Sequence, residues 1–269
     1  MMRAMRTPSC PLLVMFALVL ALAPAIASGA SSLRLEDMTT TEVREAVDAG
    51  KTTILVPIGG TEQNGSHMAL GKHNRRATLL SERIARELGN ALVAPAIAYV
   101  PEGSVDVASG HLRYAGTITI PADAFIGTLE GAARSFRLHG FRDIVLLGDH
   151  GGYRREIASA TQRLNRRWTS DAARAHALPE YYRIVEADYP KLLRARGVSD
   201  SEIGLHAGLA DTALMLALDP AYVRSDLMRM PGPGVNGDPR RATPELGTLG
   251  VDLIVSHTVD AIRKAASRR

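Results

Sequence analysis

Acidic, amide and imidazole side chains gather in one stretch of this sequence, between positions 57 and 74. The stretch reads PIGGTEQNGSHMALGKHN and contains Glu62, Asn64, His67 and His73. It follows a β-branched apolar run at 53–58, the pattern of a buried parallel strand. Ligands in α/β proteins bind beyond the carboxyl ends of such strands. We therefore expect a loop that presents these groups at the edge of a sheet.

Three further segments carry similar groups, namely GDHGGY at 148–153, HAGLADT at 206–212 and HLRYAGT at 111–117. They supply Asp149, His150, Tyr153, His206, Asp211 and, as the weakest candidate, His111. Any one of them has a plain structural explanation, because strand-end histidines are often only hydrogen-bonded, aspartates cap helices and glycines form turns. Together, several histidines and acids placed after short apolar strands predict a metal-assisted hydrolase.

Strand and helix patterns alternate along the chain and indicate an α/β fold, with a mostly parallel sheet covered by helices on both faces. The predicted strands are 53–58, 91–97, 143–147 and 183–187. The predicted helices are 35–48, 77–88, 122–139, 153–168, 207–217 and 244–266. Two loops, one after each of the first and third strands, carry a histidine and a carboxylate, and they would converge if those strands are neighbours. Trp168 ends a polar helix and is expected to pack at the surface.

The first thirty residues have the pattern of a cleaved signal peptide. Arg3 and Arg6 precede an apolar run at 11–23, and small residues then offer cleavage after Ala27 or Ala30. The run is too short for a membrane anchor, because a spanning helix needs roughly 20 apolar residues. We therefore expect an exported protein, periplasmic or secreted, with one domain at 31–269. The only cysteine, Cys10, lies in this leader, so a metal in the mature chain would be held by His, Asp, Glu or amide oxygens.

The composition is that of a water-soluble globular protein, with 46% hydrophobic and 22% charged residues. The formal net charge is +4, and the basic residues are interspersed with acids rather than gathered in a stripe, so nucleic acid is not an expected partner. A serine hydrolase is disfavoured as well, because the sequence contains no G-x-S-x-G elbow after a strand.

The ordered motifs resemble those of the creatininase family. The family pattern P-x-G-x-x-E-Q-H-G-P-H-L-P-x-x-x-D is similar to PIGGTEQNGSHMALGKH, and N-G-H-G-G-N is similar to GDHGGY. H-A-G-x-x-E-T-S, H-x-x-F-P-G-T and G-D-P-x-x-A-T-x-x-x-G are likewise similar to HAGLADTA, HLRYAGT and GDPRRATPELG. The resemblance implies a three-layer α/β/α sandwich, a homo-oligomer that is often a hexamer, and hydrolysis of a non-peptide amide or cyclic amide C–N bond at a divalent metal site.

The family's metal ligands are retained only in part. Glu62 and His150 match, whereas Asn64 replaces a His, His73 replaces an Asp that bridges two metals, and Gly152 stands where creatininase has a Glu. One neutral imidazole nitrogen offers one lone pair and cannot bridge two ions. The resemblance therefore predicts one metal per chain, held by Glu62, His73 and His150, with zinc favoured and manganese or iron as other candidates.

In this prediction a metal-activated water attacks the amide carbonyl of a small molecule. His206 matches a family active-site histidine and would protonate the leaving nitrogen, while Asp149 or Asp211 would orient a ligand histidine or take a proton. Asn64, His67, His111 and Tyr153 are candidates for orienting a ligand or contacting substrate. A second hypothesis is a catalytically inactive protein of the exported compartment that binds a small molecule.

Overall fold

The computed structural model describes residues 32–169 and 172–267, which belong to one compact unit, Ser32–Arg269. The predicted signal peptide lies outside the described residues. Within the described part of the chain, no helix has the length and apolar character that a membrane crossing requires.

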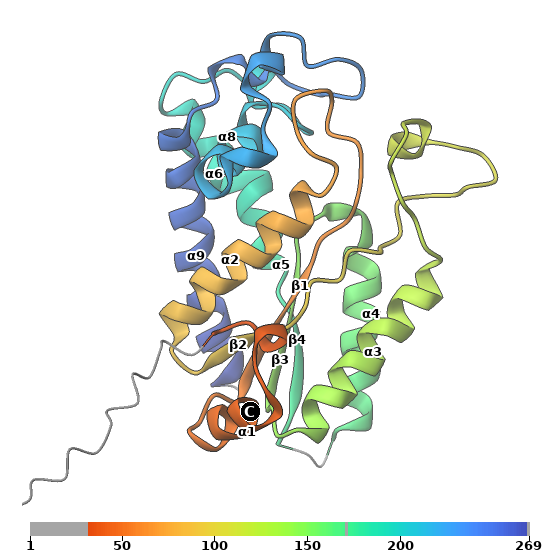
Figure 1. Ribbon diagram of the computed structural model, residues 1–269, viewed down its shortest axis with the longest axis vertical. Helices are drawn as coiled ribbons and strands as arrows, with labels where there is room; N and C mark the ends of the chain where they lie inside the picture. Colours follow the sequence, from red (N-terminus) through yellow and green to blue (C-terminus); the bar gives the residue numbers. More distant parts are fainter. Residues whose placement is uncertain (1–31, 170–171, 268–269) are drawn as a thin grey trace, which may run out of the picture. The chain divides into compact units, whose positions relative to one another are not determined.

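A four-stranded parallel sheet forms the centre of the fold (Figure 1). Its strands are β1 (Thr53–Ile58), β2 (Ala91–Val93), β3 (Asp143–Gly148) and β4 (Arg174–Ala177), in the order β2-β1-β3-β4. β1 and β3 pair along their whole length, so that Ile58 lies beside Gly148 at their carboxyl ends.

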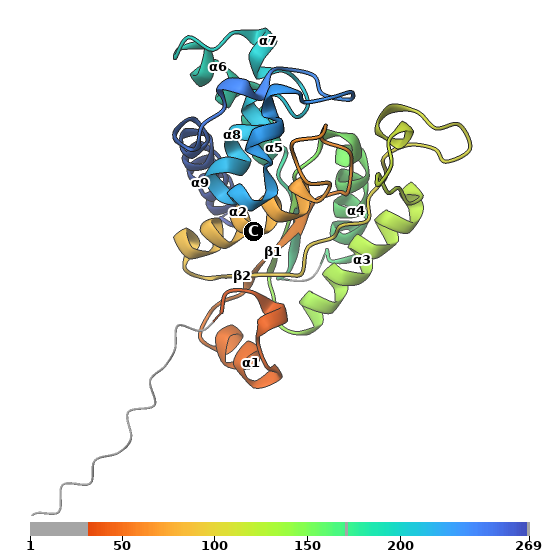
Figure 2. The same ribbon diagram turned by 45° about the horizontal axis from the view of Figure 1, so that its top comes forward.

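Helices cover both faces of the sheet (Figures 1 and 2). The core on the first face contains residues of α2 (Lys72–Leu88), α8 (Leu209–Leu218) and α9 (Pro244–Ala266), and the core on the second contains residues of α3 (Ala122–Leu138) and α4 (Arg154–Arg167). Successive strand side chains point to opposite faces of the sheet and so enter two different hydrophobic cores. Leu55 belongs to the core on the first face and Ile54 to the core on the second. The predicted three-layer α/β/α fold is confirmed.

The remaining elements are short. The α-helices are α1 (Thr40–Asp48), α5 (Pro179–Arg183), α6 (Tyr189–Arg194) and α7 (Asp200–Ile203). Single turns of 3₁₀-helix occupy Leu35–Asp37, Gly110–Arg113, Gly151–Tyr153, Pro220–Tyr222, Ser225–Arg229 and Pro239–Arg241, and a π-helical turn occupies Ile184–Asp188.

The strand predicted at 183–187 was wrong, because these residues are helical. Tyr181, Ile184 and Tyr189 bury their side chains in the first core from this helical segment. The fourth strand is instead Arg174–Ala177, whose short sequence RAHA lacks β-branched residues. It is specified by its pairing with β3, where the His176 imidazole lies 2.9 Å from the Asp143 carboxylate.

The surface position expected for Trp168 was also wrong. Its side chain is buried in the second core, and the Arg137 guanidinium lies 5.5 Å from the ring centroid. The polar residues beside it in the sequence had suggested a surface position.

Candidate active site

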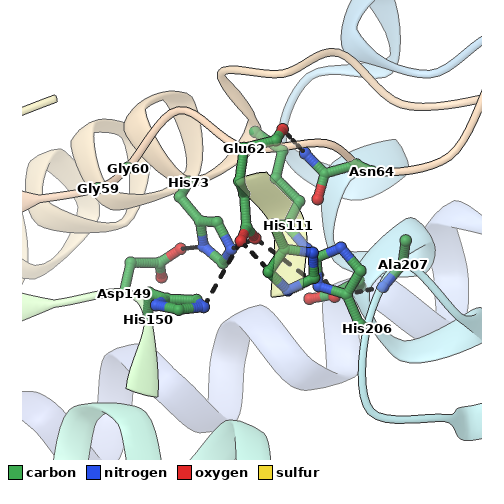
Figure 3. A network of polar contacts seen from close by, with 12 residues as sticks. Gly59, Gly60, Glu62, Asn64, His73, His111, Asp149, His150, His206 and Ala207 are labelled. Carbon is green, nitrogen blue, oxygen red and sulfur yellow. Dashed lines mark hydrogen bonds and ion pairs between the residues drawn. The ribbon is translucent and has the colours of Figure 1, made fainter. Parts of the chain in front are cut away.

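The loops that follow β1 and β3 meet at the carboxyl edge of the sheet, as expected for neighbouring strands. The first loop brings Glu62, and the second brings Asp149 and His150. His111 and His206 arrive from two other loops, so that segments far apart in the sequence surround one carboxylate (Figure 3).

Glu62 is the centre of this arrangement and is fully buried. Its Oε1 accepts a hydrogen bond from His73 Nε2 at 2.8 Å. Its Oε2 is buried and has no hydrogen-bond partner among the described residues, while the Nε2 atoms of His111 and His150 each lie 3.6 Å from it. One ligand atom from each of these three residues falls within 4.8 Å of the others, an arrangement that could hold a metal ion.

His73, which was predicted as a metal ligand, lies between two carboxylates. Its Nδ1 lies 2.7 Å from Asp149 Oδ2, so both ring nitrogens are engaged by carboxylates (Figure 3). Burial and Lys72 lower the pKa of His73, but the hydrogen bonds to Asp149 and Glu62 outweigh them and raise it. The group of atoms that could hold an ion comes from Glu62, His150 and His111, which was the weakest candidate from sequence.

A buried network of charges lies behind His73. Lys72 Nζ is 2.7 Å from Asp211 Oδ2, and Arg76 bridges Asp211 and Asp149 with contacts of 2.6 and 2.8 Å. Both cationic side chains are essentially inaccessible to solvent. Asp211 also accepts a hydrogen bond from the Ala207 amide at 2.9 Å. The Asp211 carboxylate, predicted to act in proton transfer, is thus held by two cations and a backbone amide.

The two acids of this network are ionised. Burial would raise the pKa of Asp149, but the charge of Arg76 and the hydrogen bond from His73 lower it. Burial acts the same way on Asp211, and Lys72 and Arg76 hold its pKa well below the ordinary value. Asp149 Oδ2 lies 2.7 Å from His73 Nδ1, and Asp149 Oδ1 accepts a hydrogen bond from the Tyr181 hydroxyl at 3.0 Å.

His206 faces Glu62 from the loop that precedes α8. Its Nε2–H donates to the Gln63 carbonyl at 2.8 Å, which leaves Nδ1 as the lone-pair nitrogen, 3.7 Å from Glu62 Oε1. Burial and the charge of Lys72 lower the pKa of His206 to about 3, so the imidazole is neutral near pH 7. Ala207 adopts φ 53°, a left-handed conformation that is costly for a residue with a Cβ and that recurs at functional sites.

The other predicted contacts hold the loops. Asn64 Nδ2 donates to the carbonyls of Glu62 and Ala69 at 2.9 and 3.2 Å, while its Oδ1 is buried and without a partner in the described part of the chain. His67 Nε2 lies 3.0 Å from the Thr212 hydroxyl, beside α8. The buried Tyr153 hydroxyl lies 2.9 Å from the Ile58 carbonyl oxygen, where it ties the second loop to the end of β1.

Sequence reasoning did not single out Glu102. Its side chain is 3% exposed, and Oε1 lies 3.5 Å from His150 Nδ1. Burial, together with the nearby charge of Glu62, raises the pKa of Glu102 to about 8. Burial and the charge of His73 lower the pKa of His150 to about 4. Glu102 lies in the segment PEGS, outside every motif, so the sequence gave no indication that it would lie near His150.

Known proteins are similar to this chain in sequence and in fold. The family model for creatininase, described as creatinine amidohydrolase, matches residues 36–262. Creatinine amidohydrolase of Pseudomonas putida is 25% identical over 260 residues, which cover 87% of this chain and 97% of that protein. A mycofactocin precursor peptide peptidase of Mycobacterium tuberculosis is 29% identical over 222 residues, or 74% of each chain.

Solved structures of creatininase have a similar fold. A mutant creatininase has a TM-score of 0.75 at 25% identity and covers 88% of this chain and 99% of its own. The manganese form of creatininase has a TM-score of 0.73 at 25% identity, with 87% and 99% covered. Because the family model spans most of the sequence and the fold agrees over nearly all of it, this chain belongs to the creatininase family.

Proposed function

We propose that this protein is a metal-dependent hydrolase of a small-molecule amide or cyclic amide C–N bond, with one divalent ion held by Glu62, His111 and His150. The observation that carries the proposal is the buried Glu62 Oε2, which faces two imidazole Nε2 atoms and has no partner among the described residues. A buried carboxylate oxygen without a hydrogen bond is costly, and a cation between these groups would satisfy it.

The donor set fits a single ion. Two imidazoles and one carboxylate are the ligand type of catalytic zinc with an open position, and manganese or iron would also be accepted. The other carboxylates of the network are committed: Glu62 Oε1 to His73, Asp149 to His73 and Arg76, and Asp211 to Lys72 and Arg76. A second ion at these acids would have to displace an ion pair. Structures of creatininase exist with manganese and in a Zn–Zn form.

A bound divalent ion would supply Lewis acidity toward the amide carbonyl and would lower the pKa of water at the site. The chain's own residues supply proton transfer. The lone-pair Nδ1 of His206 lies 3.7 Å from Glu62 Oε1, which places this nitrogen where it could carry a proton to the leaving nitrogen. The Gln63 carbonyl fixes the ring by accepting from Nε2, and the ring also packs 4.1 Å from that of His111, centroid to centroid.

The test compares the variants His111→Ala, His73→Gln and His206→Asn, each purified without chelators. Plasma mass spectrometry measures the metal content of each protein. A panel of cyclic amides, linear amides and peptides measures its hydrolytic activity. We expect His111→Ala to lose the ion, His73→Gln to keep it with lower stability, and His206→Asn to keep it with turnover reduced about 100-fold or more. Loss of metal in His73→Gln but not in His111→Ala would restore the ligand set predicted from sequence. Absence of metal from the reconstituted natural chain would reject the proposal.

We also propose that the protein is exported and assembles as a homo-oligomer. The leader pattern at 1–30 and the family resemblance support these two proposals. Mass spectrometry of the mature chain from the periplasmic fraction should place its first residue at Ser28 or Ser31. Light scattering on the same material should give a multiple of the chain mass. An uncleaved or monomeric protein would contradict the corresponding part.

A further inference from the structure

The backbone of His206 is held by a segment that is distant in the sequence, residues 230–238. The Asn236 amide donates to the His206 carbonyl at 2.8 Å, and the His206 amide donates to the Asn236 carbonyl at 3.1 Å. The Leu205 amide lies 2.9 Å from the carbonyl oxygen and 2.9 Å from the side-chain Oδ1 of Asn236 and donates to both. One residue of the segment therefore fixes two neighbouring residues directly before α8.

The same segment also holds the hydrogen-bond partner of the imidazole. His206 Nε2–H donates to the Gln63 carbonyl at 2.8 Å. The Gln63 side chain in turn donates from Nε2 to the Gly234 carbonyl at 2.8 Å, and the Ser66 amide donates to the Pro231 carbonyl at 2.8 Å. The donor and the acceptor of the imidazole hydrogen bond are thus both attached to one continuous segment.

Three glycines allow this segment and the residues beside His206 to approach closely. A Cβ at Gly204 would lie 1.9 Å from the Asn236 carbonyl oxygen, and one at Gly237 would lie 2.7 Å from Gly208 Cα. Gly237 also has φ 132°, a conformation that strains a residue with a side chain. It belongs to the motif GDPRRATPELG, to which the proposed function assigns no role. A side chain at position 237 would push the two backbones apart.

His206 is held on its other side as well. The Ala207 amide donates to the Asp211 carboxylate at 2.9 Å, and Ala207 adopts φ 53°. A strained conformation of this kind persists only where the surrounding contacts over-determine it. Loss of the contacts with Asn236 should therefore release the backbone of His206 and change the direction of its ring.

We propose that Asn236 and Gly237 are positioning residues of His206, which fix its backbone so that Nε2–H meets the Gln63 carbonyl and Nδ1 faces Glu62. The inference rests on the role of His206 in the proposed function. Displacement of a reacting group by about 1 Å can reduce turnover by about 100-fold. The motif acts through the imidazole and needs no contact with the substrate.

The experiment follows the His206 ring by nuclear magnetic resonance in metal-free protein with isotope-labelled histidine, and measures turnover on the amide panel. The Nε2–H signal, assigned by its loss in His206→Asn, should exchange slowly with water in the natural chain. Gly237→Ala should speed this exchange by about 10-fold, as expected when one hydrogen bond is lost. It should also lower kcat by about 10–100-fold. In the His206→Asn background it should lower kcat no further, because Gly237 acts through that ring.

Asn236 is exposed and allows a second test in a variant that is expected to fold. Asn236→Leu removes the side-chain acceptor of the Leu205 amide, whereas Asn236→Asp keeps an acceptor at that place. We expect faster exchange of the His206 Nε2–H in Asn236→Leu and natural exchange in Asn236→Asp. Circular dichroism checks that each variant is folded, and the Asn236 pair decides the question if Gly237→Ala is not.

The control is Gly197→Ala. Gly197 also has a positive φ, 78°, but a Cβ there would meet nothing within 4 Å, so exchange and kcat should be those of the natural chain. Fast exchange in the natural chain, or natural exchange in both Gly237→Ala and Asn236→Leu, would refute the positioning role while the proposed function stands. If these variants release the ring and the natural chain hydrolyses no amide, the positioning role holds and the proposed function fails.

Discussion

At the level of single residues, charged side chains that are buried or largely buried define this site. Lys72 and Arg76 neutralise Asp211 and Asp149, and Asp149 in turn holds His73 against Glu62. Burying any one of these charges alone would be costly, so each depends on its partner. The network therefore fixes Glu62 from behind and leaves its second oxygen directed at His111 and His150.

Removing the Lys72 ammonium should show this dependence. Lys72→Met leaves Asp211 with only Arg76 and the Ala207 amide, and we expect the free energy of unfolding of metal-free protein to fall by about 3 kcal/mol. Arg194→Met is the matched control, because Arg194 pairs with Asp200 on the surface, and we expect a change within about 1 kcal/mol. Urea denaturation measures both. Equal, small effects would show that the buried pair does not hold the site together.

At the scale of elements, the start of α2 delivers three of the site's residues. Lys72 and Arg76 are four positions apart and reach the same carboxylate, Asp211, while His73 and Arg76 are three apart and share Asp149. These spacings place side chains on one helical face. The helix begins directly after the loop of β1, so one local segment supplies both Glu62 and the residues that hold it.

Helix packing gives a prediction for two helical glycines. A Cβ at Gly247 in α9 would lie 1.8 Å from the Ala213 carbonyl of α8, whereas one at Gly131 in α3 would meet nothing within 4 Å. Gly247→Ala should force the helices apart and lower the free energy of unfolding by about 1–3 kcal/mol. Gly131→Ala should raise it by about 0.5–1 kcal/mol, because alanine restricts the unfolded chain and favours helix. Thermal and urea unfolding of the two variants would test this, and destabilisation by both would contradict the close approach at Gly247.

For the molecule as a whole, buried tyrosines predict sensitivity to alkali. Burial and the charge of Asp149 raise the pKa of Tyr153 and Tyr181 well above 10. In the unfolded chain these phenols ionise near pH 10, so unfolding releases protons above that pH. Their contribution to stability is complete below about pH 10 and is lost as the pH rises further.

The free energy of unfolding should therefore decline above pH 10, by up to about 1.4 kcal/mol per pH unit for each buried tyrosine. Tyr181→Phe should have a shallower decline than the natural chain in urea titrations at pH 8.5–11. Tyr99→Phe, at a side chain that is 59% exposed, should keep the natural slope. An unchanged slope in Tyr181→Phe would show that its phenol ionises in the folded protein.

The sequence by itself determined the layered fold and the family. The strand 53–58 and the helix 244–266 were predicted with the bounds that the structure has, because a β-branched run and an apolar helical period are local signals. Glu62, His150 and His206 were selected because they follow such elements within family motifs. The helical identity of 183–187 and the strand Arg174–Ala177 were not predicted, since packing against the core overrode weak local preference.

Only the tertiary structure decided which of the selected residues contact one another. The order of the motifs could not show that both ring nitrogens of His73 contact carboxylates. It also could not show that His111 lies near Glu62, or that Lys72 and Arg76 are buried beside Asp211. Glu102 lies outside every motif, and its carboxylate is 3.5 Å from His150 Nδ1 in the folded chain. Distances between side chains from different loops depend on how the strands pair and the helices pack. Spacing along the chain therefore does not predict these distances.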